Sequence, residues 1–255
     1  MRRIAIANQK GGVGKTTTVA NLGAGLARAG KSVLLIDLDP QANLTSYFGI
    51  DPEGLERTVY DVLSGGASLS DIIRPTPIEN LSLAPASLDL SAAELELVSA
   101  LGRETILRER LDELGSPFEF VLIDCPPSLG LLTVNGLVAS REVFIPVQTE
   151  FFAMKGVRRL LRTVETIRDR LRPGLEITGV ILTLADSRMR LTRDVSEAVR
   201  EAFKERVFTT VVRKNVRIAE SPSYGQPVMA YSPTSSGAAD YEALAQEVLA
   251  MAGVQ

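Results

Sequence analysis

Short apolar runs alternate with longer amphipathic stretches along the 255 residues of the chain. Consecutive apolar residues predict buried strands, and apolar residues that recur every three or four positions predict helices. The predicted strands are Ile4–Ala7, Ser32–Asp39, Leu81–Ala84, Phe118–Asp124, Glu142–Val147, Leu175–Leu184 and Val207–Val212. The predicted helices are Val19–Ala29, Lys155–Leu171, Leu191–Phe203 and Ala238–Met251, with short pieces at Thr58–Leu63 and Leu69–Ile73.

This alternation predicts an α/β fold, a doubly wound and mostly parallel sheet flanked by helices, with ligands at the carboxyl ends of the strands. Ser91 and Glu94 have the spacing of a capping box and predict a long helix that ends at Leu114. Pro146 predicts that the chain leaves the sheet there. No repeat or linker divides the chain, so residues 1–255 are expected to form a single domain.

The composition, with 45% hydrophobic and 23% charged residues, is that of a soluble globular protein. No apolar run is long enough to span a membrane, and Met1 leads directly into the first strand without a signal peptide. A cytoplasmic location is therefore expected. The chain has no histidine and one cysteine, Cys125, which excludes histidine-dependent triads, histidine-ligated zinc and a disulfide framework.

Charge is distributed unevenly, although the net charge is only −3. The stretch Lys155–Arg217 carries sixteen Lys and Arg against eight Asp and Glu. The remainder carries twelve Lys and Arg against twenty-three Asp and Glu. Such asymmetry predicts a basic surface on an otherwise acidic protein.

A glycine-rich loop, Asn8–Thr18, lies between the first strand and the first helix. Its glycines allow successive N–H groups to point inward, and the helix N-terminus adds partial positive charge, so the loop predicts a polyphosphate site. Lys15 is expected to contact the β- and γ-phosphates and Thr16 to ligate Mg²⁺. Gln9 stands where the general pattern has glycine. The loop residues predicted to bind nucleotide are Gly11, Gly12, Val13, Gly14, Lys15, Thr16 and Thr17.

Three acidic residues end strands near this loop. Asp124 fits a carboxylate that holds Mg²⁺, directly or through water. Asp37 and Asp39 are two residues apart and are expected to project to the same side, where a carboxylate can orient an attacking water. The predicted metal ligands are Thr16, Asp37 and Asp124.

Lys10, ahead of Gly-Gly-Val-Gly-Lys-Thr, resembles the early lysine of the deviant Walker A loop in the ParA/MinD group. Across essentially the whole chain, the motifs look like those of ParA/Soj chromosome-partitioning ATPases. Besides the loop they are Asp37-Leu-Asp-Pro-Gln41, Asp124-Cys-Pro-Pro-Ser128, Pro146-Val-Gln-Thr-Glu150 and Asn215-Val-Arg-Ile-Ala-Glu-Ser-Pro-Ser223. The resemblance implies a P-loop NTPase fold that uses ATP and Mg²⁺.

The same resemblance assigns roles to residues. Lys10 would reach the nucleotide of a second subunit in an ATP-bound homodimer, so Lys10, Lys15 and Asp39 form the catalytic set, with Asp39 positioning the hydrolytic water. Asn215 and its neighbours would contact adenine. Arg213 stands where family members often carry proline, and with Asn215 it is predicted to bind the nucleotide near its adenine.

DNA and protein partners also follow from the resemblance. Arg188 and Arg217 match arginines used on DNA, and Arg190 and Arg193 lie nearby, so non-specific duplex binding and a nucleoid-associated location are expected. A ParB-type centromere-binding protein would stimulate hydrolysis. The chain starts at the first strand, as in forms without an N-terminal DNA-binding extension. Tyr241–Gln255 contains no Lys or Arg, so no membrane partner is expected.

Two alternatives remain open at this point. One is a MinD-like membrane-associated spatial regulator. The other is an ATP-dependent ligase for small molecules, of the dethiobiotin or cobyrinate synthetase type, which would need a substrate pocket in place of a basic dimer face. Exposed arginines on helices can also serve only to solvate a face.

Overall fold

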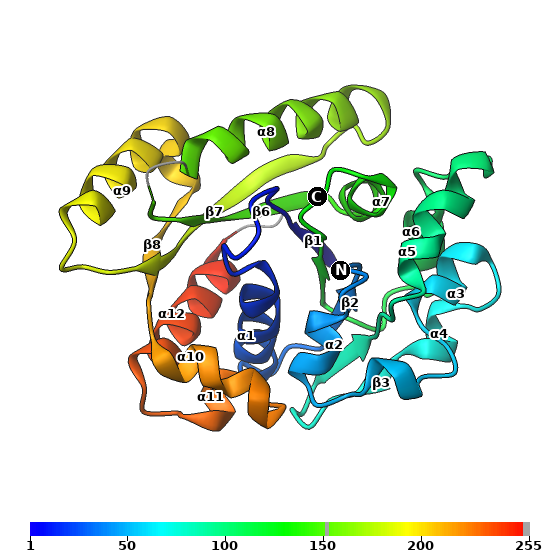
Figure 1. Cartoon of the computed structure of the whole chain (residues 1–255), viewed down its shortest axis with the longest axis horizontal. Helices are drawn as coiled ribbons and strands as arrows, with labels where there is room; N and C mark the ends of the chain where they lie inside the picture. The colour runs from blue at the N-terminus through cyan, green and yellow to red at the C-terminus, as the bar shows by residue number, and fades with distance from the viewer. Residues whose placement is uncertain (151–152, 252–255) are drawn as a thin grey trace.

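The computed structural model describes residues 1–150 and 153–251, without the side chains of 153–156. Its centre is an eight-stranded sheet in the order β3-β4-β2-β5-β1-β6-β7-β8 (Figure 1). Every neighbouring pair is parallel except β3 with β4, which is antiparallel. The strands are β1 (Arg2–Ile6), β2 (Val33–Asp37), β3 (Arg74–Pro75), β4 (Leu81–Ala84), β5 (Phe120–Asp124), β6 (Glu142–Gln148), β7 (Glu176–Ala185) and β8 (Val207–Arg213).

Helices cover both faces of this sheet (Figure 1). On one face lie α1 (Lys15–Arg28), α2 (Asn43–Tyr47), α10 (Val216–Glu220), α11 (Val228–Tyr231) and α12 (Ser236–Ala250). On the other lie α3 (Val59–Ser64), α4 (Leu69–Ile72), α5 (Leu90–Glu96), α6 (Ile106–Glu113), α7 (Leu131–Ala139), α8 (Ala153–Arg170) and α9 (Arg190–Phe203). The doubly wound α/β fold expected from the sequence is confirmed.

The central strands β2 and β5 are apolar at every position but the last because both of their faces are covered. All five residues of β2 are buried, and so are all five of β5. Successive side chains of β2 enter different cores, with Leu34 and Ile36 in one and Val33 and Leu35 in the other. The continuous apolar runs of the sequence thus correspond to strands whose side chains pack into the two hydrophobic cores on opposite faces of the sheet.

The long helix predicted up to Leu114 is wrong. The segment contains α5, a 3₁₀ turn at Leu97–Ser99 and, after a loop, α6. Asp89 is the N-cap of α5, so Ser91 lies inside that helix and does not cap it. The break has a tertiary cause, because the Asn135 side chain on α7 accepts from Leu107 N at 3.1 Å and donates to Arg103 O at 2.7 Å. Helix α7 itself was not predicted.

Pro146 does not end its strand. β6 continues to Gln148, and Pro146 pairs in register with Ile181 of β7. On its other side β1 has already ended, since the β1 pairing stops at Phe144. The Pro146 carbonyl accepts a hydrogen bond from the Asn8 side chain at 2.7 Å. The missing N–H of proline therefore costs no ladder hydrogen bond here.

No helix in the described ranges, 1–150 and 153–251, is long and apolar enough to cross a membrane. The predicted run without Lys or Arg extends to residues 252–255, which lie outside the described residues. Within the described part of that run, α12 packs against α1 and β8 and buries Tyr241, Leu244 and Val248. Its apolar face is thus part of the core.

Candidate functional site

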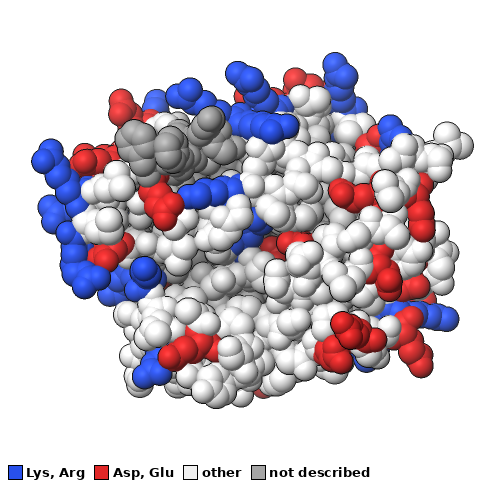
Figure 2. Space-filling view, viewed as in Figure 1, with Lys and Arg blue, Asp and Glu red and all other residues white. Residues whose placement is uncertain are grey.

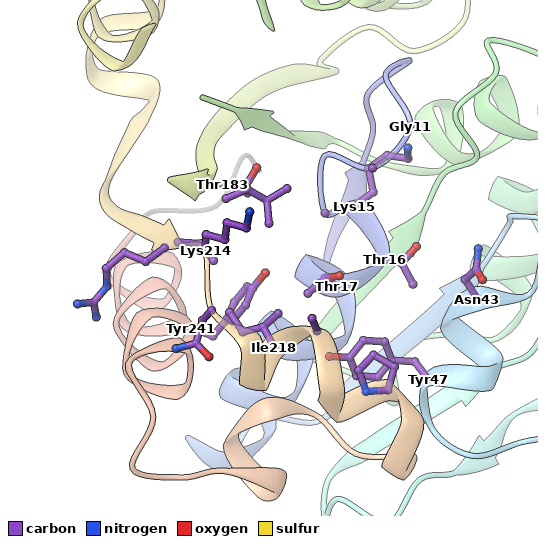
Figure 3. Close-up of a pocket in the computed structure, with 18 of the residues that line it drawn as sticks. Gly11, Lys15, Thr16, Thr17, Asn43, Tyr47, Thr183, Lys214, Ile218 and Tyr241 are labelled. Carbon is purple, nitrogen blue, oxygen red and sulfur yellow. The ribbon is translucent and has the colours of Figure 1, made fainter. Parts of the chain in front are cut away.

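A cavity of about 800 Å³ opens at the carboxyl ends of the strands. Figure 3 shows Thr16 and Thr17 on one side of it, with Lys214, Ile218 and Tyr241 on the other. The P-loop residues predicted from the sequence that line it are Gly11, Gly12, Gly14, Lys15, Thr16 and Thr17. Val13 is buried outside it, where its carbonyl accepts from the Thr183 hydroxyl at 2.8 Å and anchors the loop to β7.

The loop between β1 and α1 has the conformation that its glycines allow. Gly12 and Gly14 have φ angles of 73° and 86°, in the left-handed region that other residues rarely adopt. A Cβ atom at either position would meet no atom within 4 Å, so backbone conformation and not crowding requires glycine. Gly14 is the N-cap of α1 without a side-chain cap, which leaves backbone N–H groups available to an anion.

Lys15 lies at the start of α1 and is only 7% exposed. Burial lowers the pKa of its ammonium group, and the carboxylates of Asp124 and Asp39 oppose that shift. Its Nζ donates a long hydrogen bond of 3.5 Å to the Lys10 carbonyl. A partly desolvated cation that lines the cavity is suited to binding phosphate oxygens.

Asp124 ends β5 beneath the P-loop and is fully buried. Neither of its carboxylate oxygens makes a hydrogen bond of good geometry with the described residues. Burial first, and the nearby Asp37 second, raise the pKa of Asp124 well above its usual range, although the nearby Thr16 hydroxyl opposes this rise. An orphaned carboxylate of this kind fits a divalent cation or its water shell, with the Thr16 hydroxyl on the cavity wall as a second oxygen ligand.

Asp37 and Asp39 do not share the same role. Asp37 Oδ2 accepts from Thr45 N at 2.9 Å and Thr45 Oγ1 at 2.8 Å, and its Oδ1 accepts from Asp39 N at 3.1 Å. Asp37 is fully buried and does not line the cavity, whereas Asp39, beyond the end of β2, does. The predicted role of Asp37 as a metal ligand stays a prediction. Its hydrogen bonds with Asp39 N and with Thr45 on α2 hold the segment after β2 in place.

Burial raises the pKa of Asp37 from 3.8 to about 6 against the opposing hydrogen bonds from Thr45. The folded state therefore binds this proton more tightly than the unfolded state, and the contribution of Asp37 to stability falls as the pH rises from about 4 to about 6. The unfolding free energy of the wild type minus that of Asp37→Asn is expected to drop by up to about 3 kcal/mol over this range. Urea denaturation of the metal-free protein measures this difference.

Asp186→Asn is the matched control for this titration. The Arg188 side chain lowers the pKa of half-buried Asp186 to about 2, so its contribution is lost only below about pH 4. If the unfolding free energy of the wild type minus that of Asp37→Asn stays constant or rises between about pH 4 and about pH 6, the raised pKa of Asp37 is contradicted.

Lys10 lies outside its own cavity. Its Nζ pairs with Glu150 Oε2 at 2.7 Å and donates to Gln148 Oε1 at 3.2 Å, both at the end of β6. The side chain is 33% exposed. Lys10 thus belongs to the loop, but its side chain is held at the end of β6 and does not line the cavity that the loop encloses.

The far wall of the cavity comes from β8 and α10. Asn215 and Arg213, both predicted there, line it. Asn215 caps α10 by accepting from Arg217 N at 2.8 Å and donates to Ser236 Oγ at 2.7 Å. Arg213 is held by Asp240, with Nη2 at 2.6 Å from Oδ1. This pairing explains how arginine fits the position, because its charge is neutralised on α12.

Several wall residues were not predicted. The Tyr47 hydroxyl lies between Asn21 Nδ2 and Ser221 Oγ, each at 2.9 Å, and it ties α2 to α1 and to the turn after α10. Tyr241 lines the wall from α12. Pro222 belongs to the Asn215–Ser223 motif and could have been inferred, but nothing local to Tyr241 signals its role.

The arginines predicted to bind DNA are exposed: Arg188, Arg190 and Arg193 lie on α9 and the loop before it, whereas Arg217 lies on α10, which packs on the other face of the sheet. Figure 2 shows Lys and Arg gathered along its left edge, over α9. Arg188 forms a bidentate pair with Asp186 and Arg217 pairs with Glu220. Arg190 lies 3.8 Å from Asp194, and Arg193 is exposed on the same helix.

A glycine-rich loop that leads from a parallel strand into a helix, with a buried carboxylate at the end of the neighbouring strand, defines a P-loop nucleotide-binding protein. A protein family described as an AAA domain matches residues 1–177. The chain belongs to the Soj/ParA family of chromosome-partitioning ATPases.

Curated relatives match nearly full length. The sporulation initiation inhibitor protein Soj of Bacillus subtilis is 49% identical over 247 residues, covering 97% of this chain and 98% of the relative. The chromosome-partitioning ATPase Soj of Treponema pallidum is 47% identical over 252 residues, covering 99% and 98%.

Solved structures share the fold. Cobyrinic acid a,c-diamide synthase from Mycobacterium smegmatis, with bound ADP and magnesium, is 40% identical with a TM-score of 0.86, covering 98% of this chain and 94% of that one. The septum site-determining protein MinD of Pyrococcus horikoshii, complexed with Mg-ADP, is 31% identical with a TM-score of 0.81, covering 97% and 95%.

Proposed function

We propose that residues 1–255 act as one P-loop ATPase domain that segregates chromosome or plasmid origins. The chain binds ATP and Mg²⁺, closes into a sandwich dimer, holds duplex DNA non-specifically and releases it after hydrolysis. A ParB-type centromere-binding protein stimulates an otherwise weak hydrolysis. The single observation that carries this proposal is Lys10, a cation beside the P-loop that lies outside its own cavity.

Within one subunit, the roles follow the geometry of the cavity. Lys15 and the N–H groups from Gly11 to Thr17 hold the phosphates, while Thr16 and Asp124 hold Mg²⁺. Bound Mg²⁺ neutralises charge on the phosphates. Asp39 lines the cavity, with its Oδ1 fixed by Gln41 N at 3.0 Å, and orients the attacking water.

Dimerisation gives Lys10 a function. In the free chain it is held by Glu150, and in the dimer it reaches the phosphates bound by the other subunit. ATP then favours the dimer because the γ-phosphate adds contacts that exist only between subunits. Hydrolysis removes those contacts and lowers the affinity of the two subunits for each other.

Arg188, Arg190, Arg193 and Arg217 supply the DNA surface in this proposal. Two copies side by side would present twice the number of cations to the backbone phosphates of one duplex, which explains why DNA binding would depend on ATP. The protein would then be cytoplasmic and associated with the nucleoid.

A small-molecule ligase is the second candidate, because a neighbour of 40% identity bears the name of a cobyrinic acid a,c-diamide synthase. Transfer of an amide nitrogen from glutamine needs a reactive nucleophile. This chain has no histidine, and Cys125 is fully buried, with burial raising the pKa of its thiol.

A MinD-like membrane role is less favoured, because α12 packs its apolar face into the core. Pelleting the protein with liposomes in the presence of ATP would test this role.

Duplex DNA binding tests the proposal. Affinity is measured over a salt series with ATP, ADP and no nucleotide for the wild type, Arg217→Ala and Arg110→Ala. Arg110 is a matched control because it forms an i,i+3 pair with Glu113 on α6, as Arg217 does with Glu220. Binding is expected only with ATP, and Arg217→Ala should weaken it and reduce the slope of log K against log salt by about one.

Arg110→Ala should retain both the affinity and the slope of the wild type. Lack of DNA binding by the wild type in every nucleotide state would refute the partition function and favour the ligase.

A further inference from the structure

A second concave surface lies away from the nucleotide cavity, between α7 and α8. This α7/α8 groove has a volume of about 460 Å³. Its floor is apolar and consists of Leu131 and Val134 from α7 with Ile167 and Leu171 from the end of α8. Leu131 and Val134 are three residues apart and half-buried, so one stripe of α7 remains accessible.

Cations form one rim of the α7/α8 groove. Arg159, Arg162 and Arg170 line it from α8 and are exposed. Within the described part of the chain, the ion pairs made by α8 comprise only Arg168 with Asp169. The one acidic residue of the lining, Glu104, already pairs with Arg103 at 3.1 Å. The three guanidinium groups thus lie along one side of an apolar floor and have no carboxylate partners among the described residues.

This pattern differs from that of the arginines predicted to contact DNA. Arg188, Arg190 and Arg217 each pair with a carboxylate of their own segment. Figure 2 shows a further set of Lys and Arg along the upper edge, over α8. Arg193 is exposed without such a pair, but no described apolar floor lies beside it, whereas Arg159, Arg162 and Arg170 lie next to one.

Further exposed apolar residues lie on the chain segment that leads to the α7/α8 groove. Leu101 is 99% exposed, and Leu95 and Val98 are 79% and 57% exposed on the segment that leads to Glu104. Leu101 precedes Glu104 by three residues, so at most about 11 Å of chain separates it from the groove. Exposed large apolar residues in such a cluster mark an interaction site.

We propose that the α7/α8 groove docks an acidic amphipathic segment of another protein. The apolar floor receives leucine-like side chains, and Arg159, Arg162 and Arg170 form charge-assisted hydrogen bonds with flanking carboxylates. Arginine is enriched at protein interfaces, and the fully buried core of an interface is more apolar than the rest of the surface. Duplex DNA offers phosphates to the rim, but its backbone has nothing to fill the apolar floor.

The spacing of the rim defines the segment. Arg159 and Arg170 are eleven residues apart on α8, about 16 Å along its axis. A partner helix of about three turns spans this distance, with carboxylates toward both ends and apolar residues every three or four positions between them.

The test uses a fluorescein-labelled synthetic helix of about eighteen residues, with leucines on one face and glutamates beside them. A second peptide carries lysines in place of the glutamates. Fluorescence anisotropy measures binding to the wild type, to the double variant Arg159→Glu/Arg162→Glu and to Arg168→Glu. Arg168 is the matched control because it is exposed on the same helix but does not line the groove.

The acidic peptide is expected to bind the wild type saturably and the double variant at least about tenfold more weakly. Arg168→Glu should change the affinity by less than about twofold. The lysine peptide should show the reverse preference and bind the double variant better than the wild type. ATP binding and thermal melting check that each variant is folded, and Arg162→Gln replaces the double variant if that one fails to fold.

Four results would overturn the proposal. The first is that the acidic peptide shows no saturable binding, and the second is that both peptides bind equally well. The third is that the double variant loses duplex DNA binding but binds the acidic peptide as the wild type does. The fourth is that the wild type self-associates and that the double variant, but not Arg168→Glu, abolishes this self-association. Since ATP hydrolysis and DNA binding are measured separately, failure here is distinguishable from failure of the partition function.

Discussion

Replacing Asp39 with alanine is expected to lower the ATPase rate by at least about a hundredfold while ATP binding survives. Asp39 lines the cavity and is the carboxylate placed to orient an attacking water. The groups proposed to hold the nucleotide, Lys15, Thr16 and Asp124, are untouched by the change. The variant should therefore accumulate in its ATP-bound state and keep binding duplex DNA after ATP addition, when the wild type has released it.

Phosphate release measures the ATPase rate, and a nucleotide titration measures whether ATP binding is retained. Asp51→Ala is the matched control, because Asp51 is also an aspartate that accepts a backbone N–H two residues on, from Glu53, but it caps an exposed 3₁₀ turn. Its ATPase rate should equal that of the wild type. An Asp39→Ala variant that hydrolyses ATP normally would remove Asp39 from the catalytic set.

The second large effect is expected from Lys10→Gln, which should abolish ATP-dependent dimerisation. A charge that contacts phosphate across a buried interface is worth about 2–5 kcal/mol, so its removal raises the dimer Kd at least about thirtyfold. ATP binding to the monomer should change much less, because Lys10 does not line its own cavity. Hydrolysis and DNA binding should both fall with the dimer.

Sedimentation equilibrium with and without ATP measures this change. Lys31→Gln is the matched control, since Lys31 also forms one exposed ion pair, with Glu119 at 2.9 Å, and is 38% exposed. An ATP-dependent dimer of normal strength in Lys10→Gln would show that Lys10 serves only its pair with Glu150.

Elements set by local sequence were predicted well. The strands β1, β2, β4, β5, β7 and β8 appear where apolar runs indicated them, and α1, α8, α9 and α12 follow the amphipathic pattern. The P-loop glycines adopt the turn expected of them, because positive φ angles at Gly12 and Gly14 are a local requirement. These features depend on neighbours within a few residues.

Errors occurred where a distant side chain decides the outcome. Asn135, on a helix that was not predicted, interrupts the segment expected to be one long helix. The different surroundings of Asp37 and Asp39 also depend on a distant residue, because Thr45 binds the first and leaves the second on the cavity wall, while the role of Asp37 as a metal ligand stays a prediction. The alternation that places residues two apart on one face holds only within a strand, and β2 ends at Asp37.

The sequence alone determined the α/β class, the P-loop and the family, because apolar periodicity and a short glycine-rich motif encode structure over distances of a few residues. Only the tertiary structure decided which polar groups face the cavity and which are already bound. It showed Asp124 without a hydrogen bond of good geometry to the described residues, Asp37 fully satisfied and Lys10 held by Glu150. The physical reason is that burial and hydrogen-bond partners come from residues far apart in the chain, which meet only when the sheet and its helices close around them.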